Sequence, residues 1–110
     1  MLIYKELMTD EAIAPVKKKI LRKLWMNVGQ IDIYLVCLNE GPDQFDIIHA
    51  GILKQKRYPK KNLRVLGIAK GWESAAYLSG RLYEHFREKY KEDIFKSQIE
   101  ADKADMFRRL

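Results

Sequence analysis

The residues best suited to chemistry in this sequence are cations, which occur in two runs that contain no carboxylate. Residues 54–64, KQKRYPKKNLR, hold six cationic side chains in eleven positions, and residues 17–23, KKKILRK, hold five in seven. Lysine and arginine pair with phosphates and carboxylates, and a cluster of them neutralises the backbone of a nucleic acid. The two runs therefore predict contact with an acidic partner, and RNA or DNA is the first candidate.

Each run supplies a set of candidate contacts. In the first, phosphate contacts are expected from Lys54, Lys56, Arg57, Lys60, Lys61 and Arg64, with Tyr58 stacking on a base. In the second, they are expected from Lys18, Lys19, Arg22 and Lys23. Like charges four residues apart on a helix repel each other by a few tenths of a kcal/mol, so their repetition favours a polyanionic partner. The alternative, in each case, is a solvated turn or a lysine-rich outer face of a helix.

A third candidate is the stretch GIAKGWES, which begins at Gly67. Gly67, Lys70 and Gly71 precede an expected helix, whose free N–H groups and positive dipole end can hold an anion. The alternative is that Gly67 allows close packing and Gly71 makes a turn.

The sequence carries no signature of catalysis or metal binding. Its two histidines, His49 and His85, lie in different expected elements, and no P-loop, nucleophile elbow or paired metal-ligand spacing is present. We therefore expect a non-enzymatic protein without a cofactor or metal, in which His49 has a structural role.

Composition sets the broad class. The chain has 110 residues, a net charge of +6 and 47% apolar residues, as expected for one domain, with a core at about 10–90 and a helical extension at about 93–110. It has no apolar run of the ~20 residues that span a bilayer and no signal-peptide pattern, so a cytoplasmic protein without membrane contact is expected. From Glu84 onward the charges balance, which assigns the positive excess to the first two thirds.

Hydrophobic periodicity predicts the elements that position these residues. Apolar residues at spacings of three and four predict a helix that begins between Asp10 and Pro15 and ends before Gly29. Apolar, β-branched segments predict strands over 30–38, 45–53 and 63–69, and the helical period returns over 72–90. The predicted fold is α+β: a three-stranded antiparallel meander with helices on one face, in the order α-β-β-β-α, plus a C-terminal helix. Its other face would be apolar, covered by a second copy of the chain or by the terminal helix.

The element order and the stretch YLVCLNEGPDQF resemble the double-stranded-RNA-binding domain. Tyr34, Gly41 and Pro42 match that family's strand tyrosine and Gly-Pro turn, while Gln44 stands where the family has histidine. The resemblance covers about residues 10–90 and implies contact with the RNA minor groove. Trp72 and Glu73 occupy the region of the family's phosphate-binding lysines. FDIIHAGI and LRVLGIAKGWESA more loosely resemble short uncharacterised bacterial proteins.

These observations predict a small basic binding module that contacts nucleic acid through residues 54–64 and 17–23. The alternative is a protein-interaction or homodimerisation module that uses the apolar sheet face and the C-terminal helix.

Overall fold

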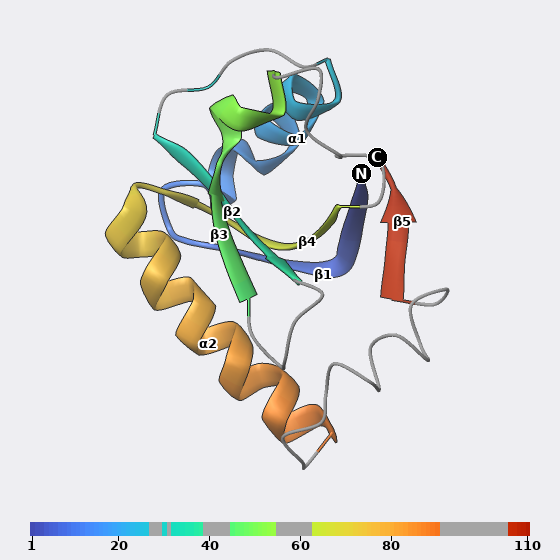
Figure 1. Ribbon diagram of the computed structural model, residues 1–110, viewed down its shortest axis with the longest axis vertical. Helices are drawn as coiled ribbons and strands as arrows, with labels where there is room; N and C mark the ends of the chain where they lie inside the picture. The colour runs from blue at the N-terminus through green and yellow to red at the C-terminus, as the bar shows by residue number, and fades with distance from the viewer. Residues whose placement is uncertain (27–29, 31, 39–44, 55–62, 91–105) are drawn as a thin grey trace.

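A five-stranded mixed sheet forms the centre of the protein (Figure 1). The computed structural model describes residues 1–26, 30, 32–38, 45–54, 63–90 and 106–110. The strands are β1 (Leu2–Thr9), β2 (Ile33–Leu38), β3 (Phe45–His49), β4 (Arg64–Lys70) and β5 (Phe107–Arg109), in the spatial order β3-β2-β4-β1-β5. The helices are α1 (Lys17–Trp25) and α2 (Trp72–Tyr90), with short 3-10 helices η1 (Ala14–Val16) and η2 (Ala50–Lys54).

The predicted three-stranded meander is wrong, because β4 pairs with β2 rather than with β3. The strand β2 lies between β3 and β4, antiparallel to both, while β1 runs parallel to β4. The physical reason is composition. Every residue of β2 except Tyr34 is buried, as suits a strand covered on both sides, whereas Asp46 and His49 leave β3 exposed in part, as suits an edge.

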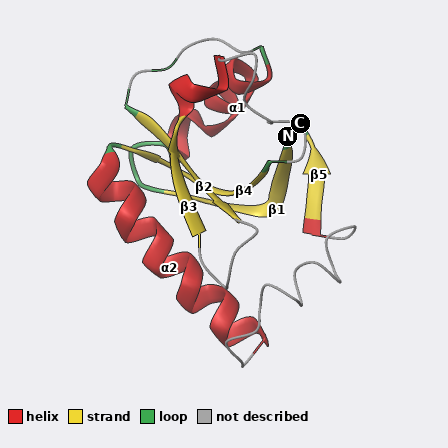
Figure 2. Ribbon diagram, viewed as in Figure 1, coloured by secondary structure: helices red, strands yellow, loops and turns green. Residues whose placement is uncertain are grey.

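Two strands at the chain ends were not predicted. The segment Leu2–Thr9 forms β1, whose Ile3 and Tyr4 are almost completely buried. Residues Phe107–Arg109, expected to be helical, form β5 and pair antiparallel with β1 (Figure 2). The backbone N–H of Leu110 donates to the Met1 carbonyl at 3.0 Å, which extends this pairing. The predicted terminal helix is therefore wrong at its end, and residues 93–105 lie outside the described residues.

The first helix begins later than its periodicity predicts. The Asp10 carboxylate accepts the backbone N–H of Ile13 through Oδ1 at 2.9 Å and that of Lys70 through Oδ2 at 3.0 Å. Asp10 therefore holds a turn and joins the end of β1 to the end of β4. Pro15 follows in η1, and the α-helical backbone starts only at Lys17.

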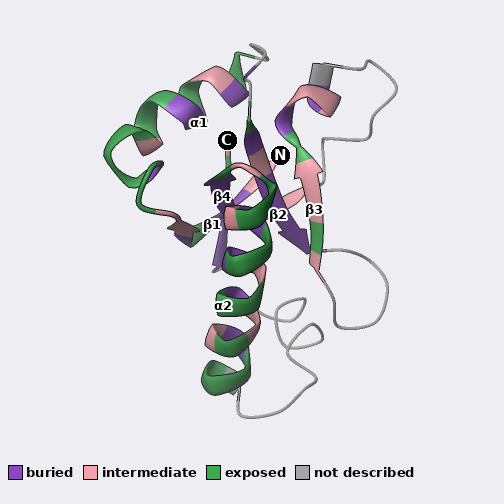
Figure 3. Ribbon diagram, turned by 90° about the vertical axis from the view of Figure 1, so that its left-hand side faces the viewer, coloured by how far each residue is buried: buried purple, intermediate pink, exposed green. Residues whose placement is uncertain are grey.

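The two helices cover opposite faces of the sheet, which corrects the prediction that both lie on one face (Figure 1). Alternating residues of a strand point to the two sides, except where a register shift interrupts the pairing of β4, which lets Val65 and Ile68 share one side. The α1 side buries Ile3, Leu35, Cys37, Val65 and Ile68 with Ile20, Leu21 and Leu24 of α1. The α2 side buries Tyr4, Val36, Leu38 and Leu66 with Leu78, Leu82 and Phe86 of α2. The central strands β2 and β4 are consequently buried over most of their length, whereas the outer side of α2 is exposed (Figure 3). The face predicted to need a partner is covered by α1.

Candidate functional site: a cationic groove between α1 and β5

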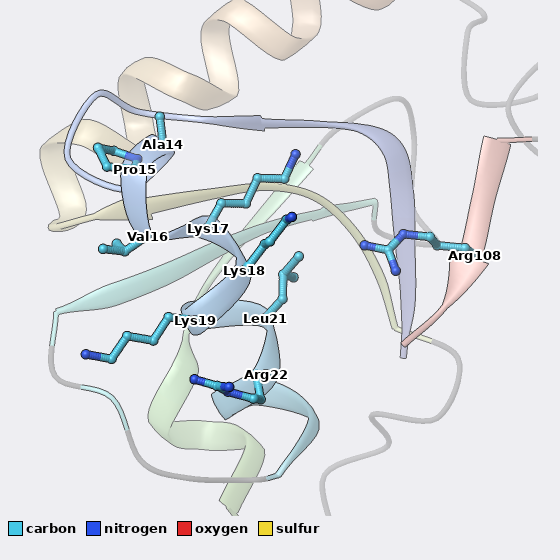
Figure 4. Close-up of a pocket in the computed structure, with 9 residues that line it drawn as sticks. All are labelled: Ala14, Pro15, Val16, Lys17, Lys18, Lys19, Leu21, Arg22 and Arg108. Atoms are coloured by element: carbon cyan, nitrogen blue, oxygen red, sulfur yellow. The ribbon is translucent and has the colours of Figure 1, made fainter.

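A groove of about 800 Å³ runs along the start of α1 and is closed on one side by β5 (Figure 4). Its lining residues are Ala14, Pro15, Val16, Lys17, Lys18, Lys19, Leu21, Arg22 and Arg108. Five of these described residues are cations and none is a carboxylate. The groove therefore combines a concave shape with charge of one sign, which concentrates anions.

Arg108 reaches the groove because of the strand register. It pairs directly with Ile3 of β1, and Ile3 packs into the core on the α1 side. Register partners point to the same face of a sheet, so Arg108 also projects toward α1. Figure 4 shows its guanidinium extending from β5 toward Lys17 and Lys18, whereas Lys19 extends away from it. Two segments more than eighty residues apart in the chain thus supply one charged site.

The groove continues along one side of α1 to its last residue. A second hollow of about 320 Å³ shares Lys18, Leu21, Arg22 and Arg108 with the first and adds Trp25 and Leu110. Lys18, Arg22 and Trp25 follow one another at spacings of four and three, which places them on one side of the helix. No side chain caps the N-terminus of α1, and its first turn has no acid, so the positive dipole end adds to the lysine charges.

The structure brings together part of the predicted helix set. Lys18, Lys19 and Arg22 line the groove, as do Lys17 and Arg108, which the sequence-based list omitted. Lys23 is half-buried and is not a lining residue of either hollow. Only the pairing of β5 with β1 identifies Arg108, since the FRR segment by itself carries no signal of a site.

The basic run 54–64 is only partly described. Lys56, Arg57, Tyr58, Lys60 and Lys61 lie outside the described residues, and only the backbone of Lys54, at the end of η2, is described. Arg64 pairs with Leu2, which packs on the α2 side, so it points away from the α1 groove. Arg64, the described end of this run, therefore lies on the opposite face of the sheet from the cations of α1.

The glycines of the predicted anion site have internal roles. A Cβ on Gly67 would lie 2.8 Å from Leu78 Cδ2 and 3.1 Å from the Met8 carbonyl oxygen, so this position allows α2 to approach β4. Gly71 has φ +85°, which favours glycine, and its N–H donates to the Asp32 carbonyl at 2.7 Å. Because the Lys70 N–H donates to Asp10, two of the backbone donors that an anion would use at this site are already engaged.

A polar cluster that sequence reasoning missed connects β1 to α2. The Tyr4 hydroxyl donates to Glu6 Oε2 at 2.8 Å and lies 3.1 Å from His85 Nε2, and Lys89 Nζ lies 3.7 Å from the same Glu6 oxygen. The hydrogen bond from Tyr4, followed by the charge of Lys89, lowers the pKa of Glu6. The cluster holds the second half of α2 against β1.

The other histidine, His49, is engaged locally. Its Nδ1 accepts the backbone N–H of Gly51 at 3.0 Å, and its ring packs edge-on against Tyr34 at 5.1 Å between centroids. Within the described ranges, no three His, Cys, Asp or Glu residues lie close enough together to hold a metal ion.

Comparison with known proteins adds no relative. No protein-family model matches the chain, and neither the curated proteins nor the solved structures contain a significant match. The resemblance to the double-stranded-RNA-binding domain therefore rests on the residues quoted above, and the meander that it implied differs from the mixed sheet. None of the helices in the described residues has the length and apolar character that crossing a bilayer requires.

Proposed function

We propose that this protein is a non-enzymatic module that binds nucleic acid through the groove between α1 and β5. The observation that carries the proposal is that Lys17, Lys18, Lys19, Arg22 and Arg108 line one concave surface, where no carboxylate is among the described lining residues. A solvated lysine-rich helix face accounts for the cations of α1. It does not account for the addition of Arg108 from a distant strand.

Charge elsewhere in the molecule favours the same surface. The exposed side of α2 carries Glu73, Glu84 and Glu88 among its cations, so it offers no run of a single sign. On α1, five cations occur within nine residues and no acid is present. A polyanion would therefore be drawn to the α1 side of the sheet.

Counterion release makes this proposal quantitative. Binding that neutralises five phosphates would give a slope of log K against log salt of about −3.5 for a single strand and about −4.5 for a duplex. Base contacts would add affinity without changing that slope.

The test is a titration of labelled RNA and DNA, followed by fluorescence anisotropy at several salt concentrations. The double variant Arg22→Glu/Arg108→Glu should weaken binding more than about tenfold and reduce the salt slope by about 1.4 for a single strand or about 1.8 for a duplex. The control Arg81→Glu, on the exposed side of α2, makes the same change of charge as the single variant Arg22→Glu, which is measured beside it. Because Arg22 and Arg108 are exposed, the double variant should retain its thermal unfolding midpoint.

Equal weakening by Arg81→Glu and Arg22→Glu would show that net charge, rather than the groove, governs binding. Failure of the wild-type protein to bind any nucleic acid at low salt would overturn the proposal. The homodimerisation alternative relied on an apolar sheet face and on the C-terminal helix, and the packing of α1 on that face within one chain favours the groove over it.

A further inference from the structure

We infer that the groove takes a single strand, with one nucleobase stacked on Trp25 and the backbone on the cations of α1 and β5. This inference rests on the proposed function and specifies the form of nucleic acid. It is carried by the position of Trp25, an exposed aromatic side chain at the end of a cationic groove.

Trp25 is unusually exposed for its type. Its side chain is 68% exposed, although the three buried residues of α1 show that the helix has an apolar side available for packing. Tryptophan is usually well buried, and an exposed one next to a binding surface is typical of contact residues. The core on the α1 side therefore does not explain its presence at this position.

The surroundings of Trp25 suit a base. The hollow that it lines also contains Leu21, which is buried, and Leu110, which packs against the core on the α1 side. These two side chains provide an apolar floor beside the indole. Lys18 and Arg22 lie within about 10 Å of Trp25 along the helix axis, at 1.5 Å per residue, so neighbouring phosphates can meet cations while the base stacks.

A duplex cannot use this arrangement. Its bases are already stacked within the helix, so an aromatic side chain on the protein surface has no base face to contact. The exposed indole therefore favours unpaired nucleotides.

The chain contains a matched control for this residue. Trp72 is 56% exposed but stands at the start of α2, where its ring contacts Tyr34 edge-on at 6.0 Å between centroids. Since α2 covers the opposite face of the sheet, Trp72 lies outside the groove. Replacing either tryptophan removes a similar exposed surface, but only one replacement changes the proposed site.

The experiment measures binding of three probes of about ten nucleotides: a single strand, the same sequence as a duplex, and a single strand with abasic spacers. The wild-type protein should prefer the single strand to both other probes. Trp25→Ala should weaken single-strand binding by about five- to 150-fold, while Trp25→Phe keeps most of the affinity. The salt slope should not change in either variant, because the phosphate contacts remain. Trp72→Ala should leave binding unchanged.

Several results would overturn the inference while leaving the proposed function intact. They are equal affinity for the abasic strand and the normal single strand, stronger binding of the duplex than of the single strand, or equal effects of Trp25→Ala and Trp72→Ala. Each of them contradicts the inference alone if Arg22→Glu/Arg108→Glu still loses binding. If the arginine double variant binds normally, the proposed function itself fails. Quenching of Trp25 fluorescence in Trp72→Phe provides a direct readout of stacking, and its absence on saturation would also contradict the inference.

Discussion

The two faces of the sheet are covered by helices of different kinds. On one side α2 has 19 residues, and its Leu78, Leu82 and Phe86 are at most 2% exposed. On the other side α1 has nine residues, and its three buried side chains retain 6–8% exposure. The charges differ too, since α2 has three acids and three Lys or Arg residues whereas α1 has five cations alone.

This difference indicates a division of roles. The interface between α2 and the sheet is the more completely buried of the two, and dense packing without voids contributes strongly to the stability of the fold. A short helix with concentrated like charge contributes less to folding, and its cations repel one another until an anion is present. We therefore expect substitutions on the α2 side to change stability and substitutions on the α1 side to change binding.

The largest effect is expected for truncation of a buried leucine, which can be compared between the α2 side and the α1 side of the sheet. Leu82→Ala removes a side chain with no exposed surface, and Leu24→Ala one that is 6% exposed. We expect losses of about 4 and about 3 kcal/mol in the free energy of unfolding, since buried Leu→Ala changes cost about 2.7–5 kcal/mol. Urea denaturation monitored by circular dichroism measures both. A larger loss for Leu24→Ala would contradict the division of roles.

The next effect tests the close approach of α2 to β4. In Gly67→Ala the new methyl would lie 2.8 Å from Leu78 Cδ2 and 3.1 Å from the Met8 carbonyl oxygen, which is backbone. We expect a loss of about 1–3 kcal/mol, typical of overpacking. In the double variant Gly67→Ala/Leu78→Ala the total loss of stability should be smaller than the sum of the losses in the two single variants. Removing the Leu78 side chain removes its clash with the new methyl at position 67. Strict additivity would show that the new methyl does not clash with Leu78.

A smaller effect of opposite sign is expected at Gly80 on the exposed side of α2. A Cβ at this position would meet no described atom within 4 Å, and glycine inside a helix costs about 0.5–1 kcal/mol relative to alanine. Gly80→Ala should therefore raise the free energy of unfolding by about that amount. A loss of stability in Gly80→Ala would contradict this expectation and indicate a contact of Gly80 with residues outside the described ranges.

The smallest effect concerns pH and the cluster that joins β1 to α2. Because the pKa of Glu6 is lowered in the folded state, its carboxylate stabilises the fold above its unfolded pKa, and this stabilisation is lost as pH falls through the folded value. Glu6→Gln should lower stability slightly at neutral pH, and the difference should vanish in acid. Thermal melts from pH 7 to pH 3 measure it, with Glu88→Gln as an exposed control on α2. A difference that grows in acid would reverse the expected sign.

The sequence predicted the elements whose signals are local. The strands β2 and β4 and the helix α2 lie close to their expected positions because each has its own periodicity or turn residues. The strand expected over 45–53 is wrong in its second half, since β3 ends at His49 and Ala50–Lys54 form η2. The first strand was missed because its main partner is β4, about sixty residues away, and parallel pairing leaves no hairpin signal. The last strand has three residues, which is too short for a period to be seen.

The site shows the same limit. Lys18, Lys19 and Arg22 could be selected from the charge run, whereas Arg108 joins them only through the register of β5 on β1. The expectation of a bare apolar sheet face arose because β2 is apolar in both registers. That observation was correct, but it indicates helices on both faces as readily as a missing partner.

The buried thiol of Cys37 is a natural chemical probe for opening of the core. It is the only cysteine in the chain and lies fully buried in β2, where burial, assisted by the charge of Asp46, raises its pKa. An alkylating reagent needs the thiolate, so it can react only when the core on the α1 side opens and exposes Cys37. The labelling rate would thus follow this opening without any engineered probe, and a bound oligonucleotide should slow it by the factor by which it stabilises the closed state.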